Sequence, residues 1–134
     1  MVVGIDFGRK RIGIAALHGD RLVLPLATIV QNSRKTSLAA VLKHLGELGC
    51  ERVVVGLPLN MDGTEGPAAR AARTFAEELG QAAKVPVELH DERLSSVEAR
   101  NRTRAASRGK RHNGHDDAIA ACVILESWMR SHPR

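Results

Sequence analysis

Aromatic residues are almost absent from this sequence: its 134 residues include two Phe, one Trp and no Tyr. Recognition of planar ligands mainly by aromatic stacking is therefore not expected. Cysteine is equally scarce, since Cys50 and Cys122 are the two in the chain and lie in no metal-ligand spacing. A disulfide framework and a zinc–thiolate site are both disfavoured, and we expect a reducing, cytoplasmic setting.

Long apolar runs are also missing. The longest, LVLPLATIV at residues 22–30, contains Pro25 and is far shorter than the roughly 20 residues that a membrane-spanning helix needs. Asp6 interrupts the apolar N-terminal stretch, so no secretory leader is expected. At 43% hydrophobic, the chain can form one core but is too short for two ordinary domains. We expect a single domain over residues 1–134 and no membrane segment.

Acidic residues are absent from residues 99–115, although the net charge of the whole chain is only +5. The basic residues of this segment are Arg100, Arg102, Arg104, Arg108, Lys110 and Arg111. Such a local concentration of charge favours a specific anionic partner. A solvated surface loop is the structural alternative.

Three short apolar segments begin the chain, at residues 2–8, 11–17 and 21–29. Their spacing predicts an antiparallel meander. The residues that follow predict a helix capped by Ser37 and ending at Gly49.

The middle of the chain predicts a strand, a helix and a second strand. Residues 52–58 are continuously apolar and β-branched, as in a strand covered on both faces. An alanine-rich helix is expected from about Pro67 to Gly80, followed by a strand at residues 85–91. Because a helix joins these two strands, they should be parallel.

Two more helices are expected at the C-terminal end. Ser95 and Glu98 have the spacing of a capping box, which predicts a helix starting near Ser96. A last amphipathic helix has Ala118, Cys122, Leu125 and Met129 on its apolar face, with Ser127 and Arg130 off it. The whole pattern predicts an α/β fold, a mixed sheet with helices on its faces.

Carboxylates occur where the predicted elements end or begin: Asp6, the pair Asp91 and Glu92, and the pair Asp116 and Asp117. Successive strand residues face opposite ways, so we favour Glu92 for a shared site and Asp91 as a structural partner of Arg93. Asp116 suits a helix cap and Asp117 a functional role. The alternative for each acid is a purely local structural role.

Several carboxylates brought together repel one another unless a cation compensates their charge. Hard oxygen ligands favour Mg²⁺ or Mn²⁺, so we predict metal ligands at Asp6, Glu92 and Asp117, with Asp116 as a further candidate. Two such cations can activate a water and stabilise the leaving oxygen of a phosphodiester. The acids and the basic segment together indicate a nuclease.

The predicted nucleic-acid contacts are basic residues beside these acids. They are Arg9, Lys10, Arg93, Arg100, Arg104, Arg108, Lys110 and Arg111. The loop within GLPLNMDGTEGP, residues 56–67, could add a phosphate site through its backbone amides. With so few aromatic residues, contact should depend on phosphate and shape, and sequence specificity should be weak.

Four strings occur in order along the chain: GIDFGRKRIG, GLPLNMDGTEGP, DERLSSVEAR and HDDAIAACVILES. Together they resemble the YqgF family of pre-16S rRNA nucleases and Holliday junction resolvase-like proteins, over nearly the whole chain. The resemblance implies a ribonuclease H-like fold with strand order 3-2-1-4-5 and metal-dependent phosphodiester cleavage. It also implies catalytic roles for Asp6, Glu92 and Asp117.

Two points bear on the residues that the resemblance implies. The residue before the last catalytic aspartate is usually apolar in the family, whereas here it is Asp116, which leaves open which neighbour binds metal. In the implied strand order the fifth strand lies about 10 Å from the first. Glu92 would therefore have to reach inward from beyond the end of its strand.

Several functions remain open from sequence. The first is an endonuclease acting on structured RNA, by resemblance at the 5′ end of pre-16S rRNA in ribosome biogenesis. Cleavage of four-way DNA junctions is the second, and it would call for a homodimer rather than a monomer. A non-catalytic RNA-binding module for ribosome assembly is a different class. An actin-like ATPase is disfavoured because it needs two such domains.

Overall fold

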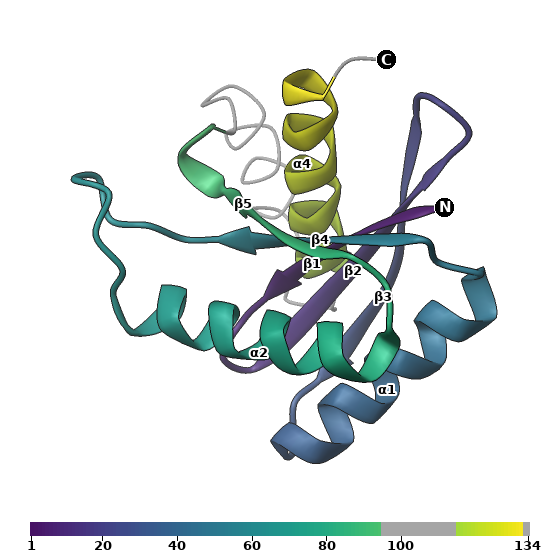
Figure 1. Ribbon diagram of the computed structural model, residues 1–134, viewed down its shortest axis with the longest axis horizontal. Helices are drawn as coiled ribbons and strands as arrows, with labels where there is room; N and C mark the ends of the chain where they lie inside the picture. Colours follow the sequence, from purple (N-terminus) through teal and green to yellow (C-terminus); the bar gives the residue numbers. More distant parts are fainter. Residues whose placement is uncertain (95–114, 133–134) are drawn as a thin grey trace.

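The computed structural model describes residues 1–94 and 115–132 (Figure 1). Its elements are β1 (Val2–Phe7), β2 (Arg11–His18), β3 (Leu22–Val30), α1 (Arg34–Leu48), β4 (Arg52–Leu57), α2 (Pro67–Ala83), β5 (Val87–Asp91), the 3₁₀ turn η1 (Glu92–Leu94) and α4 (His115–Ser131). The described helices include none long and apolar enough to cross a membrane.

The five strands form one sheet in the order β3-β2-β1-β4-β5. β1, β2 and β3 pair antiparallel, whereas β4 pairs parallel with both β1 and β5. This confirms the predicted meander, the parallel β4–β5 pair and the strand order implied by the resemblance. A register shift between Ile14 and Ala15 interrupts the β2–β3 ladder.

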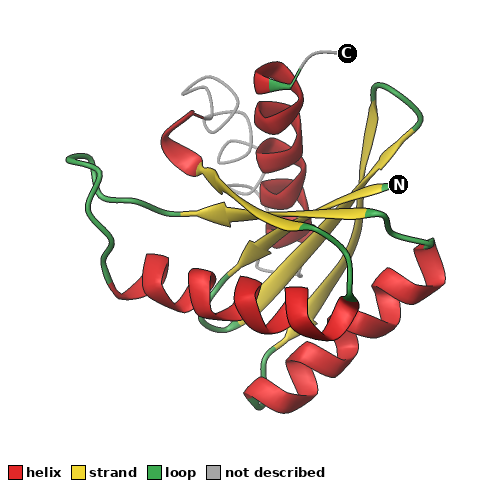
Figure 2. Cartoon of the chain, viewed as in Figure 1, coloured by secondary structure: helices red, strands yellow, loops and turns green. Residues whose placement is uncertain are grey.

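Helices cover both faces of the sheet (Figure 2). One face packs against α1 and α2 around Val3, Ile5 and Phe75, and the other packs against α4 around Val54, Ala121 and Leu125. Alternating residues of β1 therefore enter opposite cores, as the two-residue period of a strand requires. Asp6 lies on the α4 side and its neighbour Phe7 on the α1/α2 side.

Some predicted helix boundaries were wrong. The cap of α1 is Ser33, whose hydroxyl accepts from the Thr36 amide, while Ser37 is buried inside the helix. Helix α2 continues past Gly80 to Ala83, and α4 begins at His115, so Asp116 lies inside its first turn rather than at a cap before it. The helix expected near Ser96 lies outside the described residues.

Candidate active site

Asp6 and Asp117 are brought together by the close packing of α4 on the sheet. Asp6 pairs with Gly13 across the β1–β2 ladder. A Cβ atom added at Gly13 would lie 1.8 Å from the Asp117 carbonyl oxygen and 2.8 Å from the Ala118 nitrogen. The backbone of α4 therefore rests on the bare Cα of Gly13, directly beside Asp6, because paired antiparallel residues lie about 5 Å apart.

The electrostatics of the pair follow from this packing. Burial, together with the smaller effect of the negative charge on Asp117, raises the pKa of Asp6 from 3.8 to about 6. Oδ2 of Asp117 is buried, and no partner donates a hydrogen bond to it within the described part of the chain. A buried carboxylate oxygen without a donor is costly unless a cation compensates it.

A divalent cation fits these two side chains. Its charge would oppose the repulsion between Asp6 and Asp117, and it would supply the missing partner of the Asp117 oxygen. Within residues 1–94 and 117–132, however, no three His, Cys, Asp or Glu side chains lie together as a complete metal site. The side chain of Asp116 is not among those described, and its role as a ligand stays a prediction.

Glu92 reaches inward from β5, as the sequence analysis required. It lies in η1, and a Cβ atom at Gly56 of β4 would be 3.1 Å from its Oε2 atom. The carboxylate thus lies against β4, the strand between β5 and β1. The absence of a side chain at Gly56 makes this approach possible. A direct catalytic role of Glu92 stays a prediction.

Polar contacts that the sequence analysis missed hold α4 against β5. His90 and Ser127 are both buried, with His90 Nε2 2.8 Å from Ser127 Oγ. Trp128 Nε1 donates to Glu88 Oε1 at 2.8 Å. The helical pattern predicts Ser127 off the apolar face of α4, but the end of β5 lies there and buries it. Burial lowers the pKa of His90, which favours a neutral ring beside the Ser127 hydroxyl.

The loop between β4 and α2 is closed by its own hydrogen bonds. The Asn60 amide donates to the Thr64 carbonyl at 2.9 Å, and the Gly63 amide donates to the Asn60 carbonyl at 2.8 Å. Asp62 Oδ1 accepts from the Thr64 hydroxyl and amide, and these bonds lower the pKa of Asp62. The amides of Asn60, Gly63 and Thr64 are therefore occupied within the loop, and a phosphate site at the other amides of residues 56–67 stays a prediction.

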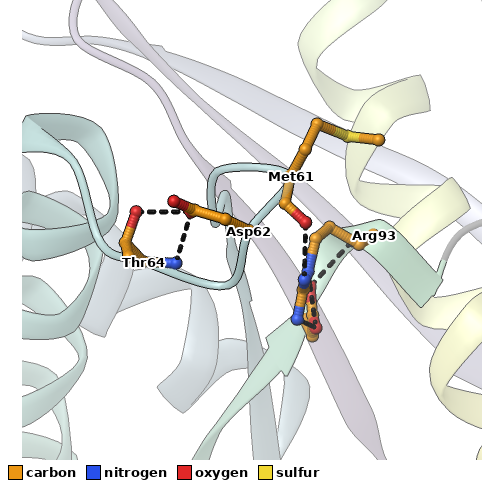
Figure 3. Close-up of polar contacts among 5 residues, drawn as sticks. Met61, Asp62, Thr64 and Arg93 are labelled. Carbon is orange, nitrogen blue, oxygen red and sulfur yellow. Dashed lines mark hydrogen bonds and ion pairs between the residues drawn. The ribbon is translucent and has the colours of Figure 1, made fainter.

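Arg93 joins this loop to the turn that carries Glu92 (Figure 3). Its Nη2 and Nε atoms lie 2.8 Å and 3.1 Å from Asp91 Oδ2, and its backbone amide donates to Asp91 Oδ1 at 2.9 Å. Its Nη1 donates to the Met61 carbonyl at 3.2 Å. The partnership of Asp91 with Arg93 is confirmed, and it lowers the pKa of Asp91. The exposed Arg93 guanidinium is thus engaged within the protein, and its contact with nucleic acid stays a prediction.

We expect Arg93→Lys to lower the rate of cleavage about tenfold while leaving nucleic-acid affinity within about twofold of wild type. Lysine keeps the charge but lacks the planar fork that contacts Asp91 and Met61 together. Single-turnover rates and binding titrations separate the two effects. Arg52→Lys is the matched control, because Arg52 forms its ion pair with Glu88 elsewhere on the sheet. A change confined to affinity would show instead that Arg93 acts as a direct nucleic-acid contact.

The other predicted basic residues fall into two groups. Arg9 and Lys10 are exposed in the turn between β1 and β2, next to the strand end that carries Asp6. Arg100, Arg104, Arg108, Lys110 and Arg111 lie outside the described residues, so their contacts stay predictions.

Comparison with known proteins identifies the family. The model of the RuvX family, described as Holliday junction resolvase, matches residues 1–131. This chain belongs to the RuvX family. A relative from Anaeromyxobacter sp. (strain Fw109-5), named "Putative pre-16S rRNA nuclease", is 49% identical over 130 residues, covering 95% of this chain and 94% of the relative. A relative from Myxococcus xanthus with the same name is 44% identical over 133 residues, covering 97% and 87%.

Solved structures agree with this RuvX assignment at the level of the fold. Thermus thermophilus RuvC in complex with a Holliday junction substrate has a TM-score of 0.61 at 17% identity, covering 98% of this chain and 95% of that chain. The Fowlpox virus resolvase with Holliday junction DNA has a TM-score of 0.62 at 14% identity, covering 99% of both chains. These similarities confirm the ribonuclease H-like fold.

Proposed function

We propose that this protein is a divalent-metal-dependent endonuclease that processes the 5′ end of pre-16S rRNA. The observation that carries the proposal is the Asp6–Asp117 pair, in which a raised pKa and a buried oxygen without a donor both call for a cation. The names of the curated relatives support the RNA substrate. A RuvX nuclease acting on structured RNA accounts for the acids and for the excess of positive charge.

In this proposal, acidic residues bind the metal ions and basic residues bind the phosphate backbone of the substrate. Asp6 and Asp117 would hold Mg²⁺ or Mn²⁺, with Glu92 and Asp116 as further candidate ligands. When bound, the cations would activate a water and stabilise the oxygen that leaves the scissile phosphate. Arg9 and Lys10 extend from the adjacent turn and would position the phosphate backbone. Because these contacts read no base edges, cleavage should follow the shape of the substrate.

Four-way DNA junctions are the second candidate substrate. The RuvX family description and the two structural neighbours with junction DNA favour it. One assay separates the candidates: precursor rRNA and a synthetic junction are offered side by side with Mg²⁺ and with Mn²⁺. Preferred cleavage of the precursor supports the proposal, and symmetric cleavage of the junction alone would replace it.

Calorimetric titration with Mn²⁺ tests the non-catalytic alternative. A nuclease of this design should bind the cation in the wild-type protein and lose most of that binding in Asp117→Asn. Asp20→Asn, in the exposed turn between β2 and β3, is the control. The absence of binding in wild type, or equal binding in the two variants, would favour an RNA-binding module.

We expect the triple variant Arg104→Ala, Arg108→Ala, Arg111→Ala to weaken nucleic-acid binding and flatten its salt dependence. Each lost phosphate contact should lower the slope of log K against log salt by about 0.7–0.9. Fluorescence anisotropy between low and moderate salt measures this slope. A control variant with Arg21, Lys43 and Arg130 changed to alanine removes the same charge elsewhere. Equal slopes in the two variants would exclude the basic segment from the interface.

A further inference from the structure

A cavity of about 670 Å³ opens on the α1/α2 side of the sheet, at the end of β1. Phe7 from β1 and Ala68 and Ala71 from α2 supply apolar surface. Arg9 from the β1–β2 turn and Arg34 from the start of α1 supply positive charge. The volume lies within the range of about 300–1,000 Å³ typical of small-ligand pockets.

The walls of this cavity are held in place by contacts within the protein. The Phe7 ring stacks on Phe75 with centroids 4.5 Å apart and planes inclined by 24°. Gln31 Nε2 donates to the Gly8 carbonyl, which ties the β1–β2 turn to the end of β3. These contacts fix the ring and the turn that bound the cavity before any ligand binds.

The charge of the cavity favours an anionic ligand with an apolar part. Acidic residues are absent from its described lining and from the first turns of α1 and α2. Arg34 Nε forms an ion pair of 2.9 Å with Glu78, which offsets part of its charge. Arg9 is exposed and should therefore contribute more to binding an anion.

The cavity and the candidate active site lie on opposite faces of one strand end. Asp6 faces α4 and the next residue, Phe7, faces α1 and α2. The exposed turn containing Arg9 and Lys10 follows directly. A nucleic-acid strand that leaves the Asp6–Asp117 pair over this turn would pass positive charge and reach the cavity.

We propose that this cavity binds one nucleotide of a single-stranded segment that flanks the scissile phosphate. Its base lies against Phe7, Ala68 and Ala71, and its phosphate contacts Arg9 and Arg34. The inference rests on the proposed nuclease function and adds a substrate feature to it, a single-stranded flank. A nucleotide combines a planar base with an anionic phosphate. The apolar wall of the cavity matches the base, and its two arginines match the phosphate.

Filling the cavity tests this assignment. Ala71 is exposed on α2, so Ala71→Leu should fold normally while it occupies the space of the base. Ala39→Leu makes the same change on the exposed face of α1, away from the cavity. Arg9→Ala removes the expected phosphate contact, and Arg21→Ala is its charge-matched control in the β2–β3 turn.

Binding of a fluorescently labelled single-stranded RNA dodecamer is measured by anisotropy in EDTA, which prevents cleavage. We expect Ala71→Leu and Arg9→Ala to weaken binding at least about fivefold, and each control by less than twofold. A dodecamer carrying 4-thiouridine should photocrosslink to Phe7 or to the first turns of α2 in wild type and lose that crosslink in Ala71→Leu. Unchanged affinity and crosslinking in Ala71→Leu would overturn the proposal.

The experiments distinguish failure of the nucleotide site from failure of the proposed nuclease function. Weakened binding in Ala71→Leu, combined with no metal-dependent cleavage by wild type, would keep the nucleotide site and reject the nuclease. Metal-dependent cleavage by wild type, combined with normal binding by Ala71→Leu, would keep the nuclease and reject the site.

Discussion

Asp6→Asn should abolish cleavage and, in the metal-free protein at pH 8, increase the free energy of unfolding by about 1–3 kcal/mol. Loss of activity of at least roughly 10³-fold is expected, because asparagine cannot supply the charge that holds a cation beside Asp117. The gain in stability is expected from the same residue, because the ionised carboxylate is unfavourable at this half-buried position beside the charge of Asp117.

The sign of the stability change follows from the pKa of Asp6. Its value in the folded protein is about 6, above the ordinary 3.8, so the folded state binds the proton more tightly than the unfolded state. Stability of the wild type should fall as pH rises from about 4 to 6 and remain lowered above that range. A difference of about two pKa units corresponds to about 3 kcal/mol, an upper limit because a buried amide also has a desolvation cost.

Urea unfolding in EDTA at pH 8 and pH 4 checks this prediction alongside cleavage assays. Asp6→Asn should be more stable than wild type at pH 8 and close to it at pH 4. Added Mg²⁺ should stabilise the wild type and not the variant. Asp20→Asn, in the exposed turn between β2 and β3, should retain activity. Retained turnover in preparations free of contaminating nuclease would reject the catalytic role of Asp6.

Gly13→Ala is expected to be the most damaging small substitution in the sheet. The new methyl group would lie 1.8 Å from the Asp117 carbonyl oxygen and 2.2 Å from its carbonyl carbon. Both are backbone atoms, so a rotamer change cannot relieve the overlap and α4 must move away from β2. We expect a loss of about 3 kcal/mol or more, and a loss of cleavage because Asp117 moves with the helix.

Gly46→Ala is the matched control for this substitution. Gly46 lies in α1, and an added Cβ would have no neighbour within 4 Å among residues 1–94 and 115–132. Alanine should stabilise that helix by about 0.5–1 kcal/mol. Thermal unfolding and cleavage are measured for wild type, Gly13→Ala and Gly46→Ala. The same chemical change should lower stability at Gly13 and raise it at Gly46. A Gly13→Ala protein with wild-type stability and activity would show that α4 does not need its close packing on β2.

The sheet is predictable from sequence because its signals are local. Apolar runs of β-branched residues separated by polar turns give β1 to β3, and the buried run at Arg52–Leu57 gives β4. Asp6 stands out for the same reason, as an acid within an apolar strand. Asp117 follows from its place in the first turn of the last amphipathic helix.

The rest depends on contacts between distant residues, which a periodic pattern does not contain. Ser127 looks exposed on a helical wheel, yet His90 of β5 buries it. The partnership of Arg93 with Asp91 is predictable, whereas its contact with the Met61 carbonyl, from the distant β4–α2 loop, is not. Glycines within the strands are the sequence signal for these approaches, since Gly13 and Gly56 mark where a helix backbone and a carboxylate come close to the sheet.

The glycine contacts of α4 also determine when activity can appear during synthesis. Gly4, Gly13 and Gly56 lie in three strands that leave the ribosome well before the helix containing Asp117. The helix has no surface to dock on until these strands have paired, and the sheet has no second carboxylate until the helix docks. A nascent chain should therefore remain harmless to nearby RNA until translation has passed the last described helix.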